Sequence, residues 1–175
     1  MREIELKVLV ELMKNSKLSD REVAEKVGSS QPTVTRTRKR LEKEGYIREY
    51  TLIPDFAKLG FEILAVTFVK FTEDLTPDRI REVKRGGREL EGENPTPTML
   101  IMRGIGFGYE GVILSLHESY SSFTELIRKT KQLPFVDISE VESFVVSLDD
   151  DHYRPLSLSH LARHLLKLGK ETQAE

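Results

Sequence analysis

The sequence predicts an α+β protein: an N-terminal winged helix-turn-helix, a ferredoxin-like βαββαβ domain and a C-terminal helical extension. Three observations lead to this fold class. Residues 18–50 carry two capped amphipathic helices, a short turn between them and a β-like segment after them. Residues 61–148 read as strand, helix, strand, strand, helix, strand. The chain has 175 residues, 38% of them hydrophobic, which is enough for two small cores.

The capping residues indicate the helix-turn-helix. The first helix of the pair begins at Ser19, and Glu22 can exchange hydrogen bonds with it, so that backbone amides at the helix start are satisfied. This helix ends at Gly28. Ser30 can cap the second helix, and Pro32 lies in its first turn, where a missing amide hydrogen costs little.

Positive charge is concentrated on the second helix. Residues 34–48 include six Lys or Arg and two Glu, a local net charge of +4 in a chain whose total is -2. Val34, Leu41 and either Thr37 or Arg38 have the spacing of a core-facing stripe. We expect the methylene stem of Arg38 to pack and its head to reach solvent. The cations on the other face are what phosphate binding requires.

Helix-turn-helix docking predicts which side chains would touch double-stranded DNA. The candidates for reading base edges are Gln31, Thr33, Arg36 and Thr37, and the candidates for holding phosphates are Ser30, Lys39, Arg40, Lys43 and Arg48. Residues 46–51 are the candidate wing. Two other interpretations exist: a solvated helix surface, which most charge runs are, and an assembly module whose basic helix serves a protein partner. The local charge of +4 weighs against the second.

Residues 4–60 resemble the N-terminal half of the Lrp/AsnC (feast/famine) family of transcriptional regulators. The resemblance is carried by residues 6–12, 18–28 and 30–47, with a family-like linker at 53–60. It implies a cytoplasmic DNA-binding regulator without a cofactor, a homodimer or higher homo-oligomer, and an optional small amino-acid-like effector. The implied divisions are a DNA-binding domain at 1–52, the linker at 53–60, a RAM-like dimerisation and effector domain at 61–150 and an extension at 151–175.

The second half supplies the ferredoxin-like order. Strands are expected at 61–71, 98–103, 111–117 and 138–148, and helices at 76–84 and from Ser119 onward, with a helix break at Gly86–Gly87. One face of such a sheet is open, and self-association is the simplest way to cover it. Residues 61–175 carry 14 Lys or Arg and 19 Asp or Glu, so this half would not be drawn to DNA.

A glycine-rich turn joins the two middle strands. The family has a turn of roughly Gly-Asp-Tyr-Asp near its effector pocket, and Tyr109 and Glu110 match its last two residues. Phe107 then takes the glycine position, unless an insertion gives that role to Gly106. The effector candidates are Gly104, Gly106, Gly108, Tyr109 and Glu110, against a purely structural turn. Residues 106–111 also spell G-x-G-x-x-G, but a strand follows, so dinucleotide binding is not expected.

Composition excludes several classes of protein. Cysteine is absent, which rules out disulfides, thiolate catalysis and cysteine zinc sites. There is no apolar run near membrane-spanning length and no signal peptide, so neither a membrane nor an export role is expected. His160 and His164 are four residues apart, near acidic residues 149–151 and His152, but a closed zinc site needs four ligands. The leucines at 161, 165, 166 and 168 instead predict a helix that packs on the domain or on a partner subunit.

No catalytic constellation is present, so we expect no enzyme. The alternative comes from resemblance alone, because sirohaem decarboxylases share this two-domain arrangement. A haem-sized pocket would need histidines and arginines, and His117 and Arg103 are the only ones on the expected middle strands.

Overall fold

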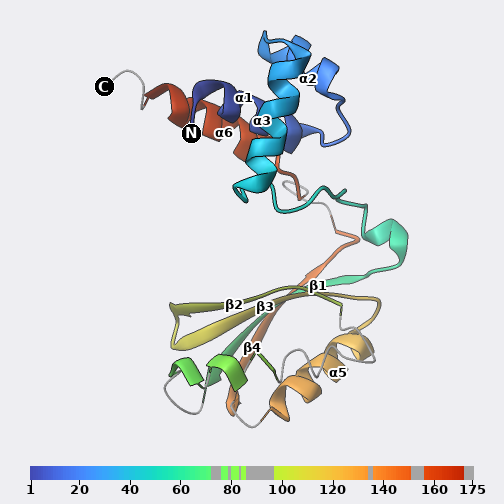
Figure 1. Cartoon of the computed structure of the whole chain (residues 1–175). Coiled ribbons are helices and arrows are strands. Elements are labelled where there is room, and N and C mark those ends of the chain that lie inside the picture. The colour runs from blue at the N-terminus through green and yellow to red at the C-terminus, as the bar shows by residue number, and fades with distance from the viewer. Residues whose placement is uncertain are drawn as a thin grey trace. The chain divides into compact units, whose positions relative to one another are not determined.

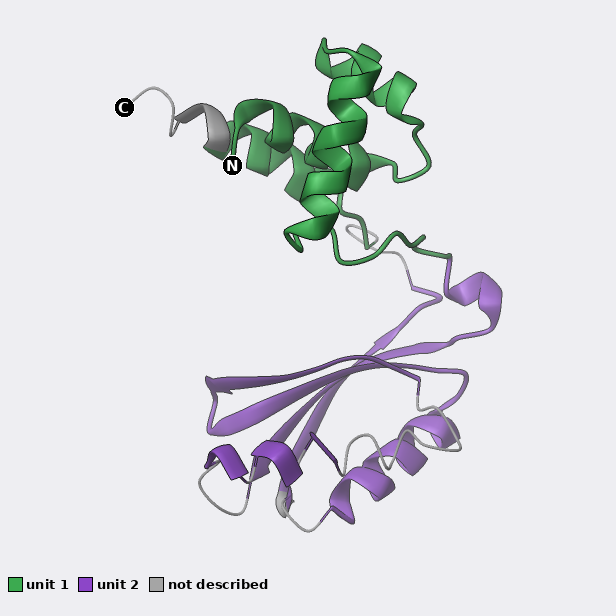
Figure 2. Ribbon diagram, viewed as in Figure 1, with its two compact units in different colours: residues 1–54, 153–175 green, residues 55–152 purple. Residues whose placement is uncertain are grey.

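The structure is a computed structural model, and it describes residues 1–71, 76–78, 80–82, 84–85, 97–133, 136–150 and 156–171, with the backbone alone at 137–139 and 169–171. Two compact units are formed (Figure 2). Unit 1 consists of residues 1–54 and 153–175, and unit 2 of residues 55–152. The C-terminal extension therefore belongs with the helix-turn-helix part of the chain, a long-range association that the sequence pattern does not specify.

Unit 1 is a bundle of α1 (Glu3–Lys14), α2 (Asp20–Val27), α3 (Gln31–Lys43) and α6 (Ser159–Glu171) (Figure 1). The predicted caps are confirmed. The backbone amide of Glu22 donates to Ser19 Oγ at 3.3 Å, and Ser19 N donates to the Glu22 carboxylate at 2.7 Å. Gly28 has a φ of 68°, the left-handed geometry that ends α2. The shared core consists of Val8, Leu12, Val23, Ala24, Val34 and Leu41.

The segment after α3 differs from the expected β-like wing. Residues 46–54 form no strand, and side chains hold the segment in place. Tyr50 Oη donates to Glu42 Oε1 at 2.7 Å, and the Arg38 guanidinium lies 5.8 Å from the centre of the Tyr50 ring. Ser16 Oγ donates to the Thr51 carbonyl at 3.3 Å. A wing strand needs a second strand with which its backbone can form hydrogen bonds. Residues 46–54 instead contact side chains of α3 and of the turn that follows α1.

Unit 2 is the predicted ferredoxin-like fold. Its elements are β1 (Ile63–Phe71), β2 (Thr98–Gly106), β3 (Tyr109–His117), α5 (Tyr120–Lys131) and β4 (Val136–Ser147), preceded by a short 3-10 turn, η1 (Ala57–Leu59). The strands pair antiparallel in the order β2-β3-β1-β4. The described residues at 77–78, 80–82 and 84–85 are helical, as expected for the first helix. The expected break at Gly86–Gly87 lies outside the described residues.

The two faces of the sheet have different chemistry. The helices lie over one face (Figure 1), and there Ala65, Thr67 and Ser115 are fully buried. On the other face the register aligns Leu100, Leu114, Val66 and Phe144 in one row across all four strands. Phe144 is 67% exposed in this row. The chain thus presents an apolar sheet face that a soluble monomer rarely leaves open.

Gly111 allows side chains of the neighbouring strand β1 to pack closely against the backbone of β3. A Cβ at this position would lie 2.6 Å from Val69 Cγ2 and 3.3 Å from Phe71 Cζ. Only glycine fits such an approach without displacing a neighbour. This explains the residue that ends the apparent dinucleotide fingerprint: it is a packing glycine inside β3.

His117 lies fully buried at the end of β3, in a polar cluster under the start of α5. Its Nε2 lies 2.9 Å from Ser115 Oγ, its Nδ1 lies 3.3 Å from Ser122 Oγ, and its ring contacts Phe123 edge to face at 5.5 Å between centroids. Burial lowers the pKa of His117, although the nearby charge of Glu118 acts to raise it. The folded protein therefore favours the neutral imidazole.

This lowered pKa predicts acid sensitivity of unit 2. Below the ordinary histidine pKa the unfolded chain takes up a proton that the buried imidazole refuses, so stability is full above that pKa and falls as the pH drops below it. Urea denaturation at about pH 7.5 and about pH 5.5 should show this loss, and His117→Gln should reduce it. His164→Gln, at an exposed position, is the matched control and should leave it intact. An equal pH dependence in His117→Gln would contradict the assignment.

Candidate nucleic-acid interface

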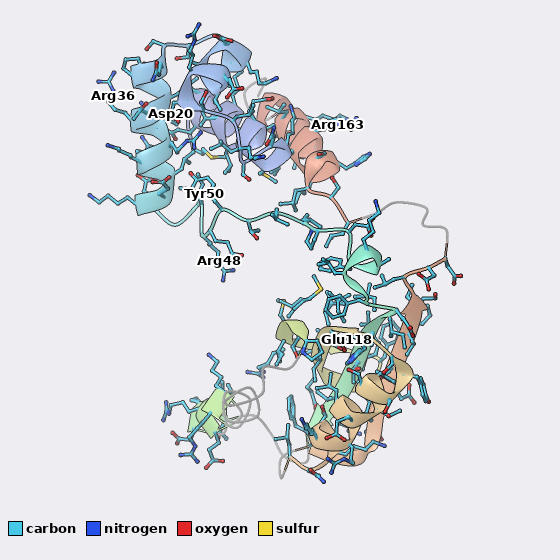
Figure 3. The ribbon with its side chains drawn as sticks, turned by 90° about the vertical axis from the view of Figure 1, so that its right-hand side faces the viewer. Asp20, Arg36, Arg48, Tyr50, Glu118 and Arg163 are labelled. Carbon is cyan, nitrogen blue, oxygen red and sulfur yellow. The ribbon has the colours of Figure 1, made fainter. Side chains whose placement is uncertain are left out.

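One side of α3 is buried in the core of unit 1, and the other side is exposed to solvent. Val34, Thr37 and Leu41 point into the core, while Gln31, Arg36, Lys39 and Lys43 are exposed. Figure 3 shows Arg36 projecting outward from unit 1. The Ser30 cap and Pro32 in the first turn define where α3 begins. The exposed face of α3 is polar from its first residue, Gln31.

Thr37 does not have the predicted base-reading role. Its side chain is 3% exposed and packs with the helix-turn-helix core. The spacing of apolar residues allows either Thr37 or Arg38 at this core position, and the structure selects Thr37. A side chain enclosed in the core cannot reach a base edge in the major groove.

Arg40 is committed to an internal ion pair, which differs from its predicted role at phosphate. Its Nη2 lies 2.6 Å from Glu5 Oε2, and its Nε lies 3.0 Å from Glu44 Oε1. Glu5 is fully buried on α1 and also binds Arg2. Arg40 therefore joins α3 to α1, because an unpaired buried carboxylate would be costly.

The ionised form of Glu5 is stabilised despite burial. Burial acts to raise the pKa of Glu5, but a 2.8 Å hydrogen bond from the Arg2 backbone amide, together with the Arg2 and Arg40 charges, lowers it overall. The carboxylate and the two guanidinium groups form one charged network that spans the ends of α1 and α3.

Arg38 is also bound within unit 1, so its head does not extend freely into solvent as expected. Its Nε lies 2.8 Å from Asp20 Oδ1, and its Nη2 donates to the Leu18 carbonyl at 2.9 Å. With the Tyr50 ring on another side, the guanidinium connects α2, α3 and the segment that follows α3. Figure 3 labels Asp20 and Tyr50, the two residues that the Arg38 guanidinium contacts in α2 and in the segment after α3.

Four cations remain available on the α3 side. Lys39, Lys43 and Arg48 are exposed and form no ion pair within the described part of the chain. Arg36 donates from Nε to the Pro32 carbonyl at 3.3 Å, which leaves its terminal nitrogens to a partner. Ser30 and Thr33 lie at the helix start, with their hydroxyl oxygens 2.8 Å apart. The structure thus separates the basic residues of α3 into structural and available groups.

The effector candidates lie around the β2–β3 hairpin. Phe107, with φ 54°, and Gly108, with φ 83°, form its two-residue turn, and Gly106 pairs with Tyr109. Glu110 accepts a hydrogen bond from the Phe71 amide at 2.9 Å. Gly104 and Gly106 are exposed on β2. β3 continues directly after the turn, so no helix N-terminus is available for a pyrophosphate, as expected.

The other candidate sites are not assembled. His117 is enclosed by Ser115 and Ser122, and Arg103 is exposed near the opposite end of β3, across from Gly111. His160 and His164 are both exposed on α6, and the described residues contain no group of three metal-ligating side chains. None of the described helices combines the length and apolarity needed to cross a bilayer.

The Glu5 network gives a stability prediction for unit 1. Glu5→Gln should lower the free energy of unfolding by about 1–3 kcal/mol at neutral pH, because Arg2 and Arg40 lose a charged acceptor. The stabilisation exists above the unfolded pKa of Glu5 and is lost as pH falls through its lowered folded pKa, so variant and parent should converge in acid. Denaturant titrations across pH measure this.

Glu25→Gln is the matched control, since its pair with Arg21 lies on the surface. It should change stability by less than about 0.5 kcal/mol. A similar effect of the two substitutions would refute a special role for Glu5.

Comparisons with known proteins agree on this architecture. Residues 1–48 match the family model described as winged helix-turn-helix DNA-binding. The regulator LrpC of Bacillus subtilis is 41% identical over 64 residues, which are 37% of this chain and 44% of that protein. The matched segment thus spans less than half of that relative. An uncharacterized HTH-type transcriptional regulator of Pyrococcus abyssi is 26% identical over 154 residues, covering 82% of this chain and 95% of that protein.

Solved structures share the fold over most of the chain. LrpC of B. subtilis has a TM-score of 0.66 at 23% identity, covering 88% of this chain and 99% of that one. A transcriptional regulator of Neisseria meningitidis, solved as a complex with L-Met, has a TM-score of 0.71 at 18% identity, covering 92% and 99%. The named relatives are transcriptional regulators rather than enzymes. With the helix-turn-helix and the β2-β3-β1-β4 sheet, these matches show that the chain is similar to regulators of the Lrp/AsnC family in its N-terminal sequence and in its fold.

Proposed function

We propose that the protein is a cytoplasmic, sequence-specific transcriptional regulator that binds double-stranded DNA through α3. The observation that carries the proposal is the exposed face of that helix, where cations remain available after Arg38 and Arg40 are paired internally. Unit 1 has a formal net charge of +5 and unit 2 of -7, so DNA is attracted to one unit only.

The proposed contacts follow from position on α3. Gln31, Thr33 and Arg36, near the helix start, would read base edges in the major groove. Ser30, Lys39, Lys43 and Arg48 would hold phosphates. Thr37 and Arg40 are not among the proposed contacts. Thr37 packs in the core, and Arg40 joins α3 to α1 through Glu5.

A homodimer formed through the open sheet face would supply two copies of α3. The row of Leu100, Leu114, Val66 and Phe144 supports this assembly, because two such faces would bury each other in an isologous contact. A two-fold dimer requires a pseudo-palindromic site with half-sites about one helical turn, or a multiple of it, apart.

Control by an amino-acid-like effector is a second element of the proposal. The N. meningitidis regulator, which shares this fold, was solved in complex with L-Met. In this chain Gly104, Gly106, Gly108, Tyr109 and Glu110 are the candidates for the edge of such a site. Repeating DNA titrations with each amino acid tests the idea, and an operator affinity that no amino acid alters would remove it.

Arg36→Ala should weaken operator binding by about 1–3 kcal/mol and relax the preference at one base position, because a bidentate contact is lost. Fluorescence anisotropy on the protein's own upstream DNA, on single-base variants and on a scrambled duplex measures both effects. Arg21→Ala removes an exposed cation of α2 that is paired with Glu25, and it should preserve the base preference. Unchanged affinity and preference in Arg36→Ala would remove this residue from the interface.

Lys43→Ala should act differently, because a phosphate contact carries no sequence information. It should weaken all duplexes alike and lower the slope of log K against log salt by about one. The same anisotropy titrations, repeated over a salt series, measure the slope. A loss confined to one sequence would show that Lys43 reads bases, and an unchanged slope would show that it contacts no phosphate.

A further inference from the structure

The C-terminal helix exposes a row of leucines. Leu158, Leu161, Leu165 and Leu168 follow one another at steps of three, four and three residues, which is the spacing of the a and d positions of a heptad. Leu158, Leu161 and Leu168 are 46%, 49% and 44% exposed, and Leu165 is half-buried. The Ala162 amide donates to the Leu158 carbonyl at 2.9 Å, so the row begins where α6 begins. We call these four residues the α6 leucine row.

The α6 leucine row is not the surface by which α6 packs on unit 1. The helix contacts α1, and Ala162 and Leu166, one turn apart, are its fully buried and half-buried positions on that side. At 3.6 residues per turn the leucine row lies beside this stripe. Single exposed leucines are ordinary on a protein surface, but a continuous apolar row at helical spacing indicates a contact surface.

Charge around the row favours a second copy of the same helix as its occupant. In a pair of helices the e and g positions flank the a and d positions, and charges there select the partner. On α6 these flanking positions are Ser157, Ala162, His164 and Gly169, none of them Asp, Glu, Lys or Arg. Arg163 falls at an outer position of the heptad. Two copies of the row can therefore meet without opposed cations, whereas an acidic partner helix would find no complementary charge along the edge.

The small size of the row requires that its occupant already be held nearby. A stable interface between free proteins takes about 20–30 residues a side, and a coiled-coil seam normally extends over at least about three heptads. The α6 leucine row has four residues in two heptads. Such a contact forms only between helices that another interface brings together, which raises their effective concentration. The homodimer proposed above supplies this condition, because each chain carries one unit 1 connected to one unit 2.

We propose that the α6 leucine row pairs with the same row of a second copy of the chain within the homodimer, and so joins the two helix-turn-helix units to each other. The proposal rests on the proposed function, because it requires the homodimer. The contact is isologous, as two-fold symmetry demands. It holds the two α3 helices at one separation, so the protein discriminates between operators by the distance between half-sites as well as by base sequence.

The absence of cysteine from the chain allows a direct test. Leu161→Cys places a single thiol in the row, and Arg163→Cys places one at an exposed outer position of the same helix as the matched control. Circular dichroism and thermal unfolding check that both full-length variants fold. A short bismaleimide, which spans paired helices in either direction, should join most of the Leu161→Cys protein into two-chain products. Arg163→Cys should give only background.

The concentration dependence of the cross-linking shows which copies meet. Light scattering first establishes the range in which the parent is a dimer. In this range the yield from Leu161→Cys should not change with protein concentration, because the contact lies within one dimer. A yield that rises with concentration would place the contact between dimers and overturn the proposal. Adding Leu158→Gln to Leu161→Cys should lower the yield, because it removes an exposed leucine from the row.

Operator spacing provides the second measurement. Inserting about five base pairs, half a helical turn, between the half-sites should weaken binding by the parent. Leu158→Gln/Leu161→Gln should reduce this loss by on the order of tenfold, because separate units can reach either spacing through their connections to unit 2. His160→Gln/Arg163→Gln, at outer positions of α6, is the control and should keep the parent's loss. An equal loss in the leucine variant and the parent would contradict the proposal.

Failure of this proposal can be distinguished from failure of the proposed function. Background cross-linking of Leu161→Cys, with a dimeric parent and operator binding that Arg36→Ala still weakens, would overturn the α6 pairing alone. A monomeric parent would overturn both the sheet-face dimer and the pairing. If parent and Arg36→Ala bind every duplex alike and weakly while Leu161→Cys cross-links within a dimer, DNA recognition fails and the pairing stands.

Discussion

The buried carboxylate of Glu5 is the constraint on which the orientation of α3 depends. Moving a charge into a protein core costs several kcal/mol unless partners replace the lost water. Arg2 supplies a backbone and a side-chain donor from the same helix, but Arg40 comes from α3. The ionised state of Glu5 therefore requires α3 to lie at one position along α1. The Arg38–Asp20 pair fixes the same helix to α2, so α3 is held on two sides by charge and on a third by its aliphatic stripe.

This arrangement explains how so basic a helix can belong to a small domain. Like charges crowded on one helix repel each other. The Arg38–Asp20 and Arg40–Glu5 ion pairs relieve part of that repulsion and also orient α3. Arg38 and Arg40 serve the fold, and Arg36, Lys39 and Lys43 project outward. The charge count alone gives no such division, because it is made by partners in other elements.

Local chemistry explains what could be predicted from sequence. The caps formed by Ser19, Glu22, Gly28 and Ser30 act within one helical turn and were therefore predictable, as was the succession of strands and helices along unit 2 from its periodicity. The missed features join distant parts of the chain: Glu5 with Arg40, Asp20 with Arg38, and α6 with α1. The sequence contains only part of this information. Glu5 stands among aliphatic positions of α1, which indicates a buried ion pair, but its position does not show that Arg40 is the partner.

Polar pairs on the helix-facing side of the sheet help to fix the strand register of unit 2. Thr67 Oγ1 and Ser143 Oγ lie 2.9 Å apart between β1 and β4, and Ser115 and His117 form a second polar pair on β3. The Thr67–Ser143 pair holds at only one register of β1 and β4, since a slip by one residue would separate the two hydroxyls and turn one of them to the other face. The same register aligns Leu100, Leu114, Val66 and Phe144 on the outer face. The hydroxyl pair between β1 and β4 thus helps to fix where Val66 and Phe144 lie in the apolar row.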